Sequence, residues 1–218
     1  MIDVKKAITQ VINRFKADPL IIHSERDIQA LLHNALLIQE SKLHKTGYDL
    51  YDKFLKTNRV HCEYQGVGRG LKGTTRLIDI VVFSEDYIDQ IKHANKLLYL
   101  NNEWGKVPCE ALIEIKFENG HKDKPGEIEI DFKKLKISQE MHIKHNDIKP
   151  KLYFIYFFFS WNLTRSKKML ALLEELPHLS QEGEKVNTYL VIGPRNIWEP
   201  IIDNLNMDID KIHLEYTI

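Results

Sequence analysis

The sequence has little cysteine and no excess of charge of either sign. Its 31 basic and 31 acidic residues cancel over 218 positions. No overall field therefore attracts nucleic acid or a membrane surface, although a local basic cleft is compatible with this balance. Cysteine occurs only at Cys62 and Cys109, in strand-like segments and without a CxxC pair. We therefore expect reduced thiols in a cytoplasmic protein.

Long hydrophobic runs are also lacking. The most apolar stretch, LYFIYFFFSW at 152–161, is too short to span a bilayer as a helix. Its β-branched and aromatic residues predict a strand that is buried on both faces. The first 18 residues are charged throughout, unlike a signal peptide. These features argue against a membrane protein and favour a globular domain with a proper core.

The sequence does contain a regular succession of helical and strand patterns. Apolar spacing predicts a helix over 2–17, and Ser24 with Asp27 approximates a capping box for a second helix that should continue until Gly47. Strands are predicted at 59–64, 76–83, 108–117, 152–161, 187–193 and 212–217, and further helices at 85–102, 127–143, 164–176 and 196–205. A glycine-rich turn should make the first two strands antiparallel, and the helix 127–143 should cross over between parallel strands. One α/β domain over 1–218 is the simplest account.

Two of the predicted strands carry charged residues. In EALIEIKF (110–117) Glu114 and Lys116 are two positions apart and therefore share a face. In RLIDIVVF (76–83) Asp79 interrupts a strand that is apolar on both faces, where an unpartnered carboxylate would be costly. If the two strands are neighbours, about 4.8 Å apart, Asp79 and Glu114 can converge on one cation within reach of Lys116.

Two carboxylates and a lysine suit the hydrolysis of a phosphodiester. Hard oxygen ligands select Mg²⁺ or Mn²⁺, which keep several waters and bind phosphate oxygens readily. Such a metal lowers the pKa of bound water and stabilises charge on the attacked phosphate. A lysine can orient that water or offset negative charge.

The placement of these residues resembles the PD-(D/E)XK nuclease superfamily. The match consists of Asp79 in one strand and Glu114-Ile115-Lys116 in the next, within an αβββαβ order over about 24–160. It implies a restriction-endonuclease-like core with a mixed central sheet flanked by helices, plus an N-terminal helix and an α/β extension at 161–218. Ile78 stands where the nominal motif has proline, and an extra helix fills the gap between the half-motifs.

The resemblance implies a function and a set of site residues. It predicts a Mg²⁺-dependent DNA endonuclease, in which Mn²⁺ can substitute, acting as a homodimer in restriction, mobile-element or repair biology. Asp79, Glu114 and Lys116 would be catalytic, and the metal would be held by Asp79, Glu114, the Ile115 carbonyl and Glu25. Contacts to the nucleic-acid backbone are expected from Arg69, Lys72, Arg76, Lys133 and Lys134.

Plainer interpretations remain beside this hypothesis. Glu114 and Lys116, with Glu110 on the same face, are also compatible with a solvated strand face. The fold could instead hold a degenerate site for nucleic-acid binding or assembly, or the chain could be an unrelated α/β partner-binding protein. The helix run of Asp131, Lys133, Lys134 and Lys136 is expected to be exposed, and His142 with His145 to lie at a solvated helix end.

Overall fold

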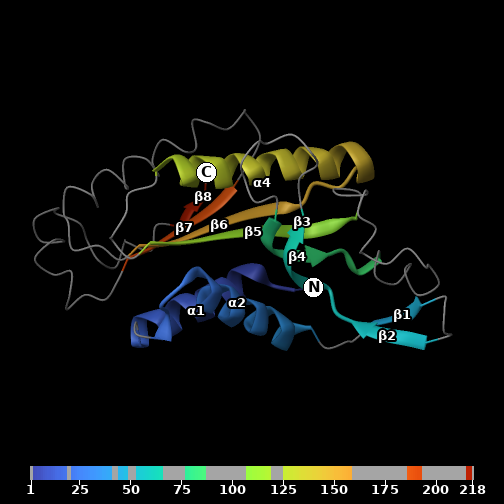
Figure 1. Ribbon diagram of the computed structural model, residues 1–218, viewed down its shortest axis with the longest axis horizontal. Coiled ribbons are helices and arrows are strands. Elements are labelled where there is room, and N and C mark those ends of the chain that lie inside the picture. The colour runs from blue at the N-terminus through green and yellow to red at the C-terminus, as the bar shows by residue number, and fades with distance from the viewer. Residues whose placement is uncertain are drawn as a thin grey trace, which may run out of the picture.

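The protein is an α/β fold built on one mixed sheet between two helical layers (Figure 1). The computed structural model describes residues 2–18, 21–40, 44–48, 53–65, 77–86, 107–118, 125–158, 186–192 and 215–217. The sheet has six strands in the order β3-β4-β5-β6-β7-β8. Their bounds are β3 Val60–Gln65, β4 Leu77–Phe83, β5 Cys109–Glu118, β6 Lys151–Phe158, β7 Val186–Ile192 and β8 Glu215–Thr217. The predicted α/β class is confirmed.

The strand directions follow from the connections. β3, β4 and β5 are antiparallel neighbours, as the turn between the first two strands predicted. β5 and β6 are parallel and are joined through α4, Pro125–Asn146, as the crossover helix predicted. β7 is parallel to β6, and β8 returns antiparallel at the edge. Segments from the predicted extension at 161–218 therefore complete the same sheet.

Two helices cover the face of the sheet opposite α4 (Figure 1). α1, Val4–Ala17, begins after Asp3, whose side chain accepts the Lys6 N–H. α2, Glu25–Gln39, begins after Ser24, whose hydroxyl oxygen accepts the Asp27 N–H. Both caps satisfy N–H groups that the first turn leaves without intrahelical partners. The predicted helix start at Ser24 is therefore confirmed.

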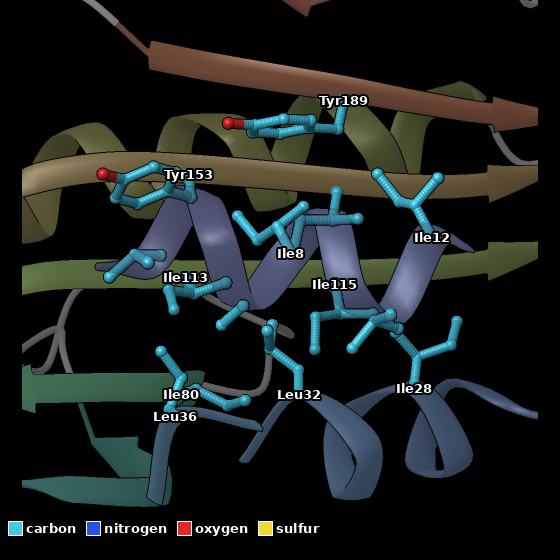
Figure 2. Packing of buried hydrophobic residues seen from close by; sticks show 14 of the residues in the cluster. Ile8, Ile12, Ile28, Leu32, Leu36, Ile80, Ile113, Ile115, Tyr153 and Tyr189 are labelled. Atoms are coloured by element: carbon cyan, nitrogen blue, oxygen red, sulfur yellow. The ribbon is translucent and has the colours of Figure 1, made fainter. Parts of the chain in front are cut away.

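The main core lies between these two helices and the sheet. On α2 the buried residues Ile28, Leu32 and Leu36 recur every four positions, which forms one apolar stripe. They pack toward Ile113 and Ile115 of β5, with Ile8 and Ile12 of α1 beside them (Figure 2). The opposite face packs on α4, where the rings of Phe132 and Phe154 meet edge to face at 6.1 Å between centroids.

Two predicted helix bounds are wrong. α2 ends at Gln39 and does not continue to Gly47, because its buried stripe stops at Leu36 and Ile38 is already 77% exposed. Gly47 lies in a hairpin formed by β1, His44–Tyr48, and β2, Lys53–Thr57, which the sequence patterns did not predict. α4 is longer than the predicted 127–143 by a few residues at each end.

Other sequence predictions fall outside the described residues. These are the glycine-rich turn, the helices at 164–176 and 196–205, and the helix at 85–102 beyond its first two residues. Within the described part of the chain, none of the helices has the length and apolar character needed to cross a membrane.

The α2 stripe gives a stability prediction with an internal control. Leu32→Ala should lower the free energy of unfolding by about 2–5 kcal/mol, because it removes buried methyl groups and leaves a cavity. Ile38→Ala, on the exposed side of the same helix, should change it by no more than about 0.5 kcal/mol. Urea unfolding of both variants measures the difference. Equal losses would contradict the packing described for α2.

Candidate functional site

The hydrogen-bond ladder between β4 and β5 stops before either strand ends. Its last pair is Ile80 opposite Ile113, and the next hydrogen-bonded step would place Ile78 opposite Ile115. Instead, the carboxylate of Asp79 replaces the β4 backbone, and its Oδ2 accepts the Ile115 N–H at 2.6 Å. β4 stays paired with β3 on both sides of Asp79, through Ile80, Ile78 and Leu77, so the sheet opens between β4 and β5.

This opening brings side chains from both helical layers to one place. From α2, Gln29 Nε2 donates to the Asp79 carbonyl oxygen at 2.8 Å. From α4, Lys134 Nζ donates to the Leu77 carbonyl oxygen at 2.8 Å. α2 and α4 lie on opposite faces of the sheet (Figure 1), so both helical layers contribute a partner to the same segment of β4.

Glu114 is buried at this opening. It is 3% exposed, and its Oε1 accepts a hydrogen bond from the Lys134 ammonium in a buried ion pair. Its Oε2 is also buried and has no hydrogen-bond partner among the described residues. The interpretation of Glu114 as part of a solvated strand face is therefore wrong. Glu110, four residues earlier on β5, is 36% exposed and pairs with Arg59.

Lys116 faces α4 and is held by two acidic residues there. Its Nζ lies 3.1 Å from Asp131 Oδ2 and 3.5 Å from Glu127 Oε2, and its side chain is 22% exposed. Burial lowers the pKa of Lys116, but Asp131, Glu25 and Glu127 outweigh burial and the net shift is upward. The amine therefore stays protonated at neutral pH.

Asp131 connects the two lysines. Its Oδ2 contacts Lys116 and its Oδ1 lies 3.5 Å from Lys134 Nζ. Sequence reasoning missed Asp131 as a site residue and gave Lys134 a different role. The available signal was helical spacing, because Glu127, Asp131 and Lys134 are four and three positions apart and so share one face of α4.

Glu25 reaches the cluster from the first turn of α2. Its carboxylate accepts the Phe117 N–H and interacts with Lys116, Asp131 and Lys134. Among the described residues no three His, Cys, Asp or Glu side chains converge on one point as a complete metal site. Glu25 thus belongs to the cluster but does not join Asp79 and Glu114 as a third ligand in this structure.

Three carboxyl groups of the site, those of Asp79, Glu114 and Glu25, have raised pKa values. Burial raises the pKa of Asp79 to about 7, the Ile115 hydrogen bond offsets part of this shift, and Glu25 adds to it. Burial and the neighbouring Asp79 raise the pKa of Glu114 well above its usual range, against the effect of Lys134. Burial likewise raises the pKa of Glu25. Clustered shifts of this kind, with named charge partners, are typical of functional sites.

The donor set fits a hard divalent cation. Four carboxyl groups (Glu25, Asp79, Glu114 and Asp131) face two ammonium groups (Lys116 and Lys134), so the ionised cluster lacks about two positive charges. Glu114 Oε2, which is buried and has no hydrogen-bond partner in the described part of the chain, would be an oxygen ligand for such a cation. Because N–H and C=O of a strand residue point to the same side, the Ile115 carbonyl also faces the opening. Mg²⁺ commonly binds through one or two carboxylates together with water and substrate phosphate.

The residues predicted to contact nucleic acid lie in different environments. Lys134 is wrong as a surface contact, because its buried amine is committed to Glu114. Lys133 is exposed and forms an ion pair with Glu129 at 3.7 Å. Arg69, Lys72 and Arg76 lie outside the described residues.

Two further expectations for α4 are wrong. The run that starts at Asp131 is not an exposed face, since Lys136 is buried like Lys134. His142 is fully buried, and burial lowers its pKa to about 4, whereas the predicted solvated position holds for His145. In both cases α4 lies flat on the sheet and buries more of its circumference than its charged sequence indicates.

A cavity of about 890 Å³ lies toward the other end of the sheet. Its lining includes Cys109 and Glu110 of β5, Lys151 and Tyr153 of β6, and Asn187 of β7. None of the carboxylates or lysines of the opening lines this cavity. Its size alone gives it no role in the chemistry of the charged cluster.

No family model, curated protein or solved structure matches this chain. The geometry of the opening between β4 and β5 is therefore the observation that bears on function.

The raised pKa of Asp79 predicts how stability depends on pH in metal-free protein. Between about pH 4 and pH 7 the folded state keeps a proton on Asp79 that the unfolded state has released, so stability falls as pH rises. Asp79→Asn keeps a hydrogen-bond acceptor for Ile115 but removes this titration. Its Tm relative to wild type should therefore be higher at pH 8 than at pH 5, in EDTA.

Asp27→Asn is the matched control. Hydrogen bonds from His23 and Ser24 lower the pKa of Asp27, so its carboxylate is ionised in both states above pH 5. The Tm difference between Asp27→Asn and wild type should be the same at pH 5 and pH 8. A pH-independent Tm difference for Asp79→Asn as well would refute the raised pKa.

Proposed function

We propose that this protein is a Mg²⁺-dependent deoxyribonuclease that hydrolyses phosphodiester bonds within DNA. The observation that carries the proposal is the pair of carboxylates at the opening, each with one oxygen engaged by the protein. Asp79 uses Oδ2 for the Ile115 N–H, and Glu114 uses Oε1 for Lys134, so that Glu114 Oε2 is buried without a partner among the residues that the structure describes. Metal-ligating carboxylates are commonly fixed by such outer hydrogen bonds.

The resemblance to PD-(D/E)XK nucleases supports the same proposal from the sequence. In the structure the Asp79 strand and the Glu114–Lys116 strand are neighbours, and β5, α4 and β6 form a parallel crossover unit. These are features that a restriction-endonuclease-like core requires. The two free thiols, Cys62 and Cys109, agree with the proposed cytoplasmic location.

The proposed roles follow from the contacts of each residue. Asp79, Glu114 Oε2 and the Ile115 carbonyl would hold Mg²⁺ or Mn²⁺. When bound, the metal supplies charge stabilisation on the phosphate and lowers the pKa of bound water. Glu25, from α2, contributes negative charge next to Lys116. Lys116 would orient the attacking water or offset charge on the phosphate.

The alternative is a DNA-binding or assembly module that has the same fold but does not hydrolyse phosphodiester bonds. The cluster of four carboxyl groups and two lysines, in which Glu114 and Lys134 are buried and the other four are half-buried, argues against it. A module that only binds DNA would gain from exposed lysine or arginine, and buried carboxylates would repel phosphate. A cation shared by these carboxylates removes that repulsion, which favours the enzymatic proposal.

Cleavage of supercoiled plasmid tests the proposal directly. Wild type should nick or linearise the plasmid with Mg²⁺ or Mn²⁺ but not with EDTA. Glu114→Gln should lose cleavage and metal binding together, because a neutral amide is a poor ligand for a hard cation. Glu110→Gln, on the same strand and face, should keep both. Cleavage in EDTA, or unchanged cleavage by folded Glu114→Gln, would contradict the proposal.

Lys116→Ala separates catalysis from metal binding. The variant should bind Mn²⁺ as wild type does, since Lys116 contacts Asp131 and Glu127 of α4. Its cleavage rate should fall about 10²–10⁴-fold, the usual contribution of a group that moves or orients a proton. Calorimetry and plasmid cleavage are measured side by side, with Lys144→Ala on the exposed end of α4 as the control. Full cleavage by folded Lys116→Ala would remove this role from Lys116.

A further inference from the structure

The two lysines at the opening are not equivalent. Lys116 stands in the position of the motif lysine, yet its contacts are Asp131 and Glu127 and its side chain is 22% exposed. Lys134, 18 residues further along the chain, has a side chain only 3% exposed and contacts Glu114 itself. The ammonium group nearest the carboxylate pair therefore comes from α4 and not from β5.

The Lys134 ammonium has protein oxygens around it on several sides. An ammonium group carries three donors. Here the acceptors come from three elements: Glu114 Oε1 on β5, the Leu77 carbonyl on β4 at 2.8 Å, and Asp131 Oδ1 on α4 at 3.5 Å. A buried amine with these partners is held in one position, because any other rotamer would leave a buried charge uncompensated.

In this arrangement the two carboxylate oxygens of Glu114 have different surroundings. Oε1 is engaged by Lys134, whereas Oε2 is buried without a partner among the described residues. A carboxylate with one oxygen fixed in this way has lost the freedom to turn both oxygens toward one cation. Its second oxygen is fixed along with the first, and the Asp79 carboxylate is close enough to act electrostatically on Glu114.

We propose that Lys134 is the positioning residue for Glu114: it fixes Oε1 so that Oε2 is presented to the divalent cation. The inference rests on the proposed metal-dependent function and adds to it a residue that the PD-(D/E)XK motif does not contain. Lys134 acts through Glu114 and does not touch the substrate. Residues that orient metal ligands in this way typically contribute 10–100-fold to metal affinity.

The test compares Mn²⁺ affinity across three lysines by calorimetry. Lys134→Met keeps most of the side-chain volume and removes the charge, and it should weaken Mn²⁺ binding about 10–100-fold. Lys116→Met and Lys144→Met should bind Mn²⁺ within about twofold of wild type, since neither lysine contacts Glu114 in the structure. Tighter binding by Lys134→Met would mean that the lysine competes with the metal, and unchanged binding would mean that it has no part; either result overturns the proposal.

A second readout needs no metal and no activity. In EDTA, Lys134→Met should lower the Tm by about 10 °C, because it leaves Glu114 buried without its counter-charge. Adding Glu114→Gln to Lys134→Met should restore part of this Tm, since the uncompensated carboxylate is then gone. If Lys134→Met fails to fold, folding of the double variant Lys134→Met/Glu114→Gln would support the proposal in the same way.

The outcomes separate the two proposals. Wild type that binds no Mn²⁺ overturns the metal-dependent function, and with it the metal role of Lys134. Wild type that binds Mn²⁺ while Lys134→Met binds equally well overturns the inference alone. A double variant that is no more stable than Lys134→Met would assign the lysine to general packing of α4, and would also overturn the inference.

Discussion

The hydrogen bond from the Ile115 N–H to the Asp79 carboxylate is the constraint on which the site depends. It ends the ladder between β4 and β5 without leaving the Ile115 N–H unpaired, a cost that a buried backbone group would otherwise impose. Because β4 stays paired with β3, the strand does not leave the sheet. What results is a local opening in a sheet that is otherwise continuous from β3 to β8.

Charged groups from several elements meet at this opening, and two of them, Glu114 and Lys134, are buried. Gln29 of α2 donates to the Asp79 carbonyl, and Lys134 of α4 donates to the Leu77 carbonyl. With the ladder interrupted, each helix layer supplies partners for β4. The net effect is an excess of carboxylates that hydrogen bonds and two lysines only partly offset, which is the condition for binding a further cation.

Sequence patterns predicted the strands well because their constraints are local. The strand with Asp79, the strand with Glu114 and the aromatic strand each have a period or composition that a helix would not tolerate. An isolated Asp in an apolar strand was enough to predict a partner for Asp79. The end of α2 was wrong because only packing shows that the buried stripe stops at Leu36 and that Ile38 is exposed.

The contact between Lys134 and Glu114 could not be predicted from the sequence for a related reason. The charged sequence EIEIDFKKLK predicts a helix that is solvated on most of its surface. The residues of this segment do not indicate that α4 lies over Glu114. Motif spacing favoured Lys116 as the lysine next to Glu114, because the two residues are two positions apart. In the structure, however, the Lys116 side chain contacts Asp131. Which lysine contacts which carboxylate is set by how α4 packs on the sheet, and the spacing of residues along the chain does not show this.

The central claim is that Asp79 and Glu114 share a cation at the opening between β4 and β5. Anomalous diffraction from crystals grown with Mn²⁺ tests it most directly. The account predicts one strong anomalous peak within about 2.5 Å of a carboxylate oxygen of Asp79 and of Glu114 Oε2, with Lys134 still bonded to Oε1. A peak elsewhere, or none at this opening in crystals that hold Mn²⁺ at other positions, would contradict it.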